Sequence, residues 1–204
     1  MPHYFEPAGP VRADDLRPLD VVLAGAPAGV VTAPGVFSAN RLDLGTSVLL
    51  RTEQRLGGPV PAAGRLLDLG CGWGPIALAL ARLAPDAEVW AVDVNPRALE
   101  LTALNASRLG LGNVRTALPD AVAPGLAFDL LWSNPPIRVG KDALHGLLRR
   151  WLDRLRPDAH ADLVTHKHLG ADSLTTWLGA QPPWTAQKLA SAKGYRVIRV
   201  TRAP

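Results

Sequence analysis

The stretch "RLLDLGCGWGPIALALARLA", residues 65–84, carries an apolar run into a helical pattern through a turn that holds three glycines. Its first five residues are typical of a buried strand, and residues 74–84 predict a helix. Pro75 suits the first position of that helix, because the N–H that proline lacks would have no intrahelical partner there. Strand, glycine-rich turn and helix in this order predict one unit of a parallel α/β sheet.

The chain after residue 84 keeps alternating between strand and helix patterns. Strands are expected over 87–94, 113–118, 127–134 and 161–166, helices over 95–110, 141–155 and 171–180, and a closing hairpin over 184–202. Asn95 is expected to cap its helix, with Pro96 at the first position and Gly110 at the end. This rhythm predicts an α/β fold with a mainly parallel seven-stranded sheet and an antiparallel C-terminal hairpin.

The N-terminal part of the chain follows a different pattern. Residues 19–33 are typical of two short strands around a Gly-Ala-Pro turn, and residues 45–56 are typical of a helix with Thr46 or Ser47 as its cap. We therefore expect residues 1–45 to form an extension with a short β-hairpin and an entrance segment, and residues 46–204 to form the main domain.

The composition, with 48% hydrophobic and 20% charged residues, is that of an ordinary globular protein. The single cysteine excludes an internal disulfide, and no apolar run approaches the roughly 18 residues that a membrane span needs. Because the N-terminus shows no export signal, the cytoplasm is the expected location. The net charge of +4, carried mostly by arginine, slightly favours a polyanionic partner such as nucleic acid.

Three acidic residues stand at or near successive strand ends, where ligands bind in sheets of this kind. Asp68 precedes the glycine turn, Asp93 lies 23 residues beyond Gly70 in "VDVN", and Asp120 lies in "LPDAV". Asp93 can accept both hydroxyls of a ribose, and Asp120 can accept an adenine amino group. A dinucleotide site would need glycine where Pro75 stands, and Asp68 suits a cationic amino group better than a pyrophosphate. Together these residues predict a nucleoside with an amino-acid end and no phosphate, which is S-adenosylmethionine.

Each of these residues also has an ordinary explanation. A glycine-rich turn can be a plain tight turn, and an acid at a strand end can be a solvated turn former. The cofactor-binding residues predicted from this pattern are Asp68, Gly70, Cys71, Gly72, Trp73, Gly74, Asp93, Val94 and Asp120. Their joint order along the chain favours a cofactor site over a set of unrelated turns.

The segment "SNPPIRVG", residues 133–140, ends a strongly apolar strand on two prolines, which force a stiff turn. With the glycine turn and the acids, this motif resembles the class I methyltransferases, and "NPPI" resembles the [DNS]-P-P-[aromatic] motif of their amino-methylating branch. The resemblance implies a Rossmann-like class I methyltransferase fold and a catalytic set of Asn134, Pro135, Pro136 and Ile137. Oxygens of Asn134 and Pro135 would accept the two N–H groups of the target amine, and Asn134 is also placed in the cofactor-binding set.

Further segments resemble the ribosomal RNA small subunit methyltransferase C-like family. They are "GVFS" (35–38), "LD" (42–43), "GT" (45–46), "DLGCG" (68–72), "DVN" (93–95), "SNPP" (133–136), "GK" (140–141) and "KGYRV" (193–197). This resemblance implies methyl transfer to N2 of a guanine in small-subunit rRNA. It also implies that Phe37, Ser38 and Thr46 line the methionine end of the cofactor or the entrance for the base.

The sequence departs from that family after the prolines, where Ile137 and Arg138 replace an aromatic-histidine pair. Arg138 can stack on a base or bind phosphate, so Ser38, Arg138, Lys141 and Lys167 form the expected substrate and RNA-binding set. We expect a single-domain form, without the second, cofactor-free copy of larger members, that acts as a monomer on structured RNA without metal or membrane.

Two other functions stay open at this point. The chain can methylate a translation-factor glutamine or adenine N6, although such enzymes usually keep an aromatic residue after the prolines. It can also be a non-catalytic RNA-binding or assembly factor that retains the fold. The "HKH" segment, residues 166–168, has too few ligands at suitable spacing to predict a zinc site.

Overall fold

A seven-stranded sheet forms the centre of the protein in the computed structural model, which describes residues 9–203. Residues 1–8 of the expected extension and residue 204 lie outside the described residues. The strands are β3 (Ala63–Leu69), β4 (Asp86–Val92), β5 (Val114–Ala117), β6 (Phe128–Ser133), β7 (Leu155–His166), β8 (Trp184–Ala192) and β9 (Tyr195–Arg202). Their order in the sheet is β5-β4-β3-β6-β7-β9-β8. Pairing is parallel from β5 to β7 and antiparallel from β7 to β8, which confirms the predicted sheet.

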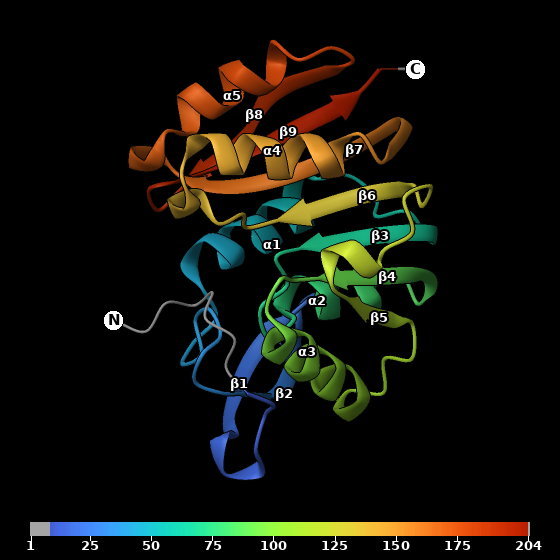
Figure 1. Ribbon diagram of the computed structural model, residues 1–204, viewed down its shortest axis with the longest axis vertical. Helices are drawn as coiled ribbons and strands as arrows, with labels where there is room; N and C mark the ends of the chain where they lie inside the picture. The colour runs from blue at the N-terminus through green and yellow to red at the C-terminus, as the bar shows by residue number, and fades with distance from the viewer. Residues whose placement is uncertain (1–8, 204) are drawn as a thin grey trace.

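Helices cover both faces of this sheet (Figure 1). They are α1 (Leu44–Leu56), α2 (Pro75–Leu83), α3 (Pro96–Arg108), α4 (Lys141–Leu152) and α5 (Ala171–Gly179). Buried side chains of α4 and α5 pack on one face, and those of α1 and α2 pack on the other. None of the helices within residues 9–203 has the length and apolar character needed to cross a lipid bilayer.

A hairpin of β1 (Arg17–Leu23) and β2 (Ala26–Thr32) forms a separate two-stranded sheet, drawn in blue in Figure 1. Its buried side chains share an apolar cluster with α2 and α3, so the hairpin packs on the helical layer and adds no strand to the main sheet. The turn falls at Ala24 and Gly25, one residue earlier than predicted, and Pro27 lies inside β2. A ribbon of two strands tolerates this proline because both of its strands are edge strands.

The cap of α1 also differs from the sequence prediction. The N-cap residue is Asp43, whose side chain accepts a hydrogen bond from the Thr46 backbone N–H at 3.0 Å. Thr46 and Ser47 lie inside the first turn instead. The prediction for α3 is confirmed, because the Asn95 side chain caps it and Pro96 takes the first position.

A buried group of charges joins α1 to the antiparallel end of the sheet. Arg199 on β9 donates to both carboxylate oxygens of Asp162 on β7, each at 2.8 Å, and to Glu53 on α1 at 3.1 Å. Burial, the strongest influence, raises the pKa of Glu53 to about 8, and the charge on Asp162 adds to this. The guanidinium therefore holds α1 at a fixed place beside β7 and β9.

Candidate functional site

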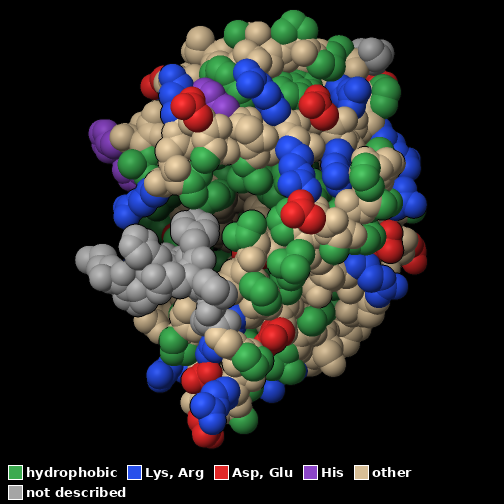
Figure 2. All heavy atoms as spheres, viewed as in Figure 1, with side chains coloured by type: hydrophobic (Ala, Val, Ile, Leu, Met, Phe, Trp, Pro, Cys, Tyr) green, Lys and Arg blue, Asp and Glu red, His purple; other side chains and the backbone are tan. Residues whose placement is uncertain are grey.

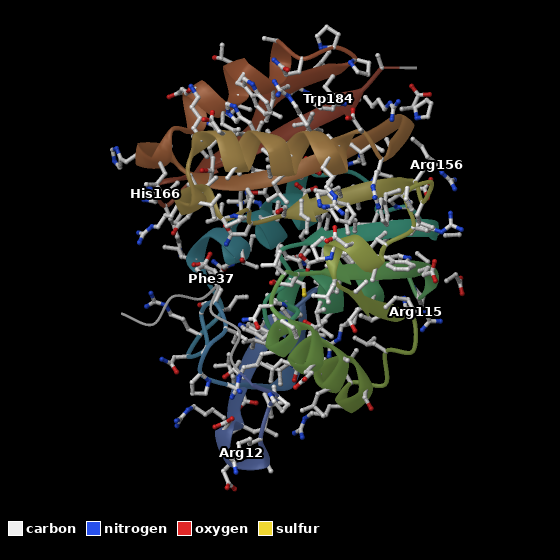
Figure 3. All side chains as sticks on the ribbon, viewed as in Figure 1. Arg12, Phe37, Arg115, Arg156, His166 and Trp184 are labelled. Atoms are coloured by element: carbon white, nitrogen blue, oxygen red, sulfur yellow. The ribbon has the colours of Figure 1, made fainter. Side chains whose placement is uncertain are left out.

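A cavity lies at the carboxyl ends of β3 and β6, where three distant segments of the chain meet. Phe37, Ser38, Asp43 and Thr46 line it from the segment around the start of α1, Gly70–Trp73, Pro75 and Ile76 from the glycine turn, and Asn134 from the end of β6. Figure 3 labels Phe37 on this side, towards which the arrows of β3 and β6 point. Seven of the fifteen residues predicted from the sequence as cofactor-binding or catalytic line this cavity, namely Phe37, Thr46, Gly70, Cys71, Gly72, Trp73 and Asn134.

The glycine turn after β3 is held in an open shape by backbone hydrogen bonds and by one side chain of α3. Gly70 and Gly72 have φ values of +79° and +57°, which disfavour any residue with a side chain. The Gly70 N–H donates to the carbonyl of Val92 at 2.8 Å, and Thr102 on α3 donates to the carbonyl of Gly72 at 3.0 Å. Apart from its two chain neighbours, no atom of residues 9–203 lies within 4 Å of the place where a Cβ on Gly70 would stand, so a ligand can approach this backbone closely.

Asp93 follows β4 and braces the same turn. Its Oδ2 accepts a hydrogen bond from the Gly72 N–H at 2.9 Å, and its Oδ1 accepts one from the Asn95 N–H at 2.9 Å. Burial raises the pKa of this carboxyl above its ordinary value, although these backbone donors oppose the shift. Because a carboxylate has about four acceptor positions, both oxygens keep capacity for the hydroxyls of a ribose.

Asp68 lies within β3, beneath the glycine turn, and is not among the residues that line the cavity. Its side chain is fully buried, and its Oδ2 accepts a hydrogen bond from the Ala77 N–H in the first turn of α2 at 2.9 Å. Its Oδ1 has no hydrogen-bond partner among the described residues. Burial raises the pKa of Asp68 to about 8. Through its hydrogen bond with the Ala77 N–H, this carboxyl fixes the start of α2.

Asn134 stands at the end of β6 with its amide group anchored. Its Nδ2 donates to Oδ1 of Asp43 at 2.8 Å and to Oγ1 of Thr46 at 3.1 Å. Within the described part of the chain, its Oδ1 takes part in no hydrogen bond that would occupy it. The oxygen of a cavity-lining amide is thus free to accept, while both N–H groups are satisfied.

The two prolines give the turn after Asn134 a defined shape. Pro136 has φ −74° and ψ 76°, the conformation of an inverse γ-turn, and the Ile137 N–H donates to the carbonyl of Pro135 at 2.8 Å. That carbonyl oxygen keeps one lone pair for a further donor. Ile137 is half-buried and packs against the apolar cluster on the α4 face, so it supports the turn from behind.

Of the predicted residues, Val94 and Asp120 lie outside the cavity wall, and Cys71 and Trp73 line it although their side chains are buried. The Trp73 side chain is 1% exposed and packs in the apolar cluster with the hairpin and α3, so its ring does not cover a ligand. Asp120 is exposed and pairs with Arg150 at 2.8 Å, outside the cavity wall. Val94 is 58% exposed just after β4. Cys71 lines the cavity but is buried, and burial raises the pKa of its thiol.

The predicted RNA-binding cations are on the surface. Arg138, Lys141 and Lys167 are exposed, in the turn after β6, at the start of α4 and after β7. Figure 2 shows Lys and Arg side chains spread over this view and mixed with acidic ones, with no single basic patch. On this face, contact with a polyanion would therefore depend on individual cations.

Sequence reasoning missed two kinds of residue at the site. Asp43 was not predicted to contact Asn134, which is 91 positions away. Thr102 and Asn105 on α3 hold the glycine turn, and the Asn105 amide donates to the carbonyls of Val31 and Trp73 at 2.9 and 3.0 Å. The available signal was their spacing of three, which puts two polar residues on one face of a helix that buries that face.

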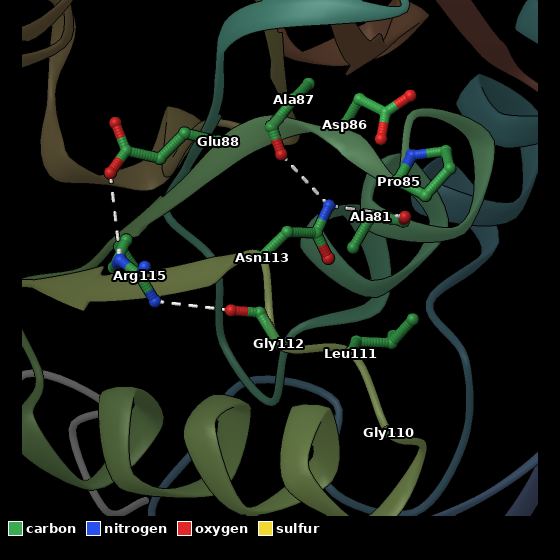
Figure 4. A pocket seen from close by; sticks show the side chains of 10 residues that line it. All are labelled: Ala81, Pro85, Asp86, Ala87, Glu88, Gly110, Leu111, Gly112, Asn113 and Arg115. Atoms are coloured by element: carbon green, nitrogen blue, oxygen red, sulfur yellow. Dashed lines mark hydrogen bonds and ion pairs between the residues drawn. The ribbon is translucent and has the colours of Figure 1, made fainter.

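A second, wider hollow lies at the opposite end of the strands (Figure 4). It is lined by Ala81, Pro85, Asp86, Ala87, Glu88, Gly110, Leu111, Gly112, Asn113 and Arg115. Asn113 donates here to the carbonyls of Ala81, Ala84 and Ala87 at 3.4, 3.1 and 3.0 Å, which is a structural use of its amide. Ligands in sheets of this kind bind at the carboxyl ends, so we assign the functional site to the smaller cavity. Among residues 9–203, no group of His, Cys, Asp and Glu is arranged to hold a metal ion.

The family model of the methyltransferase small domain matches residues 27–199. The chain belongs to this methyltransferase family. It is 35% identical over 203 residues to ribosomal RNA small subunit methyltransferase C of Pseudomonas entomophila, covering 94% of this chain and 58% of that protein. It is 34% identical over 142 residues to the uncharacterized protein YbxB of Bacillus subtilis, covering 68% of this chain and 69% of that one. The chain thus spans between about half and two thirds of the length of these relatives.

A solved structure shares this fold. The T. Thermophilus 16S rRNA N2 G1207 methyltransferase, in complex with AdoMet and guanosine, superimposes with a TM-score of 0.77 at 28% identity, covering 93% of this chain and 51% of that chain. The predicted Rossmann-like class I methyltransferase fold is confirmed. The small-domain methyltransferase family also confirms S-adenosylmethionine as the predicted cofactor. The residues here suit this molecule, because Gly70 leaves its backbone open in the cavity wall and Asp93, beside the glycine turn but not among the residues that line the cavity, keeps free acceptor positions.

Proposed function

We propose that this protein transfers the methyl group of S-adenosylmethionine to an exocyclic amine, and that this amine is N2 of a guanine in small-subunit rRNA. One observation carries the proposal. Asn134 lines the same cavity as the glycine turn, and its two amide N–H groups are bonded to Asp43 and Thr46. Its side-chain oxygen is therefore the atom offered to a substrate. The names of the relatives support rRNA as the substrate class.

The chemistry asks the protein to orient a weak nucleophile. The lone pair of an exocyclic amine is delocalised into the base, and two acceptors that bind its N–H groups turn that lone pair towards the methyl donor. Asn134 Oδ1 and the remaining lone pair of the Pro135 carbonyl are suited to this task. When bound, S-adenosylmethionine would supply the methyl group: the nitrogen–carbon bond would form as the sulfur–carbon bond broke, the neutral thioether would be released, and the nitrogen would lose a proton to solvent. Orientation of this kind can contribute roughly 7–11 kcal/mol to the lowering of a barrier.

The remaining site residues take supporting roles in this proposal. Gly70, Gly72 and Asp93 hold the nucleoside part of the cofactor, and Phe37 and Thr46 border its methionine end or the entrance for the base. The exposed cations Arg138, Lys141 and Lys167 contact RNA phosphates, with Ser38 at the entrance. We further propose that the chain divides into an entrance segment up to residue 45 and a methyltransferase domain from residue 46.

Labelled methyl transfer tests the proposal. The methyl acceptors are 30S particles and naked small-subunit rRNA, both from a strain that lacks this protein. After the reaction, nucleoside analysis identifies the methylated nucleoside. We expect N2-methylguanosine from the wild-type protein. We expect Asn134→Ala to lower the single-turnover rate by about 10²–10³-fold, by analogy with the loss of one oxyanion-hole donor. The affinity of the Asn134→Ala variant for S-adenosylmethionine should remain within a few-fold of the wild-type affinity.

Gln187→Ala is the matched control, because Gln187 is an exposed amide on β8 outside the cavity. It should transfer methyl at the wild-type rate. Methyladenosine as the product, or methylation of a glutamine in a protein, would overturn the assignment to guanine. Cofactor binding without transfer to any acceptor would mean that the protein acts as a binding factor.

A further inference from the structure

We propose that Asp43 is a positioning residue, which fixes the orientation of the Asn134 amide so that its oxygen faces the substrate amine. The inference rests on the proposed function, because it concerns the same amine-binding atom. The two residues are 91 positions apart, and the fold places Oδ1 of Asp43 at 2.8 Å from Nδ2 of Asn134.

The chemistry of a carboxylate decides which way the amide points. An ionised carboxyl accepts hydrogen bonds and donates none, so the amide nitrogen must face Asp43. With the amide turned over, the Asn134 oxygen would lie against the carboxylate. Its NH₂ group would then meet the N–H groups of the amine, which it cannot accept. Asp43 therefore selects the one orientation in which Asn134 can bind the target.

The Asp43 side chain is itself held in place by the start of α1. The same Oδ1 atom accepts the Thr46 backbone N–H at 3.0 Å, as the N-cap of the helix. The positive end of the helix dipole favours a negative charge at this position. Thr46 adds its hydroxyl oxygen as the second acceptor for the Asn134 amide, at 3.1 Å. One turn of helix thus supplies both anchors for the amide.

Two substitutions at residue 43 separate positioning from capping. Asp43→Ser keeps a good N-cap, but its shorter side chain does not reach Asn134. Asp43→Asn keeps an oxygen in the same place, which can accept from both Thr46 and Asn134. We expect Asp43→Ser to lower the single-turnover rate by roughly 10–100-fold, less than the loss of an aimed group itself. We expect Asp43→Asn to keep the single-turnover rate within a few-fold of the wild-type rate. In both variants, the affinity for S-adenosylmethionine and the melting temperature should change little.

The Asn134 side-chain amide gives a readout that does not depend on activity. In ¹⁵N-labelled protein its NH₂ signals, assigned by their loss in Asn134→Ala, should be separate and protected from exchange in the wild type and in Asp43→Asn. They should lose that protection in Asp43→Ser.

Unchanged rate and unchanged amide signals in Asp43→Ser would overturn the inference. So would an equal loss of rate and of melting temperature in both variants, because that pattern belongs to a purely structural cap. A wild-type protein that methylates no acceptor would overturn the proposed function instead. The amide signals of Asp43→Ser would then still decide whether Asp43 orients Asn134.

Discussion

Asp68→Asn should change how the stability of the protein depends on pH. Asp68 is fully buried in β3, and burial raises the pKa of its carboxyl to about 8, with the charge on Asp93 adding to the shift. In the unfolded chain the same group has a pKa near 4. Between these values the folded protein binds a proton that the unfolded chain does not. The contribution of Asp68 is therefore fully present below about pH 4 and is lost as pH rises through about 8.

The size of the effect follows from the two pKa values. Each pH unit inside the window costs the folded state up to about 1.4 kcal/mol, so wild-type stability should fall by about 2 kcal/mol between pH 6 and pH 8 through this group alone. Asparagine is neutral throughout and can still accept the Ala77 N–H, which Asp68 Oδ2 accepts at 2.9 Å. Its NH₂ group would take the place of the unpartnered oxygen, at a cost of about 1–3 kcal/mol that does not vary with pH.

Urea unfolding at pH 6, 7 and 8 measures both proteins side by side. The difference in unfolding free energy, Asp68→Asn minus wild type, should rise by about 2 kcal/mol across this range. Glu53, whose pKa is also raised to about 8, contributes equally to both proteins and cancels in the difference. Parallel curves would show that Asp68 is already ionised in the folded protein at pH 6, and the argument from burial would fail.

Three further substitutions test the cavity and its support. Asp93→Ala should weaken binding of S-adenosylmethionine by about 1.5–3 kcal/mol, the scale of hydrogen bonds to a charged group, as measured by calorimetry; unchanged affinity would make Asp93 a brace for the turn only. Gly74→Ala should lower the free energy of unfolding by about 1 kcal/mol or more beyond the loss caused by Gly110→Ala, as measured by thermal unfolding. A difference of this size is typical of overpacking. Both glycines have positive φ, but only at Gly74 would the new Cβ lie 2.9 Å from a threonine side chain of α3, and equal costs would refute this contact. Arg199→Met should destabilise the protein by about 3–5 kcal/mol, because it leaves the buried carboxylate of Asp162 without its cation, and this loss should shrink at low pH as Asp162 protonates.

The fold could be predicted almost completely because its signals are local. Apolar runs, the glycine turn and the Asn95-Pro96 start of α3 act within a few residues of themselves, and every strand and helix expected for the main sheet is present. The errors fall at one cap, one turn and one strand, because β7 begins at Leu155, six residues before the expected start at 161. Asp43, Thr46 and Ser47 are all good capping residues within one helical turn, so propensity alone could not choose among them.

The site was predicted less completely, because its assembly depends on contacts between distant residues. From the sequence, Asp68 and Asp120 can be placed near strand ends, but the burial and the contacts of their side chains cannot be predicted. Asp68 is covered by the start of α2, while Asp120 turns outwards to Arg150. The packing of the helices on the sheet decides whether an acid is covered or exposed. The spacing of the acids along the chain does not contain this information.

The segment "LDLGT", residues 42–46, shows how such distant contacts explain a motif. Asp43 and Thr46 supply the two acceptors for the Asn134 amide. Gly45 sits inside a helix, where glycine usually costs about 0.5–1 kcal/mol relative to alanine. A Cβ at Gly45 would lie 2.8 Å from the ring of Tyr195, so only glycine lets β9 pack this closely on the first turn of α1. Three segments far apart in sequence, 42–46, 133–136 and 193–197, thus depend on one another at a single place. A change in any one of them should therefore affect the position of the Asn134 side-chain oxygen.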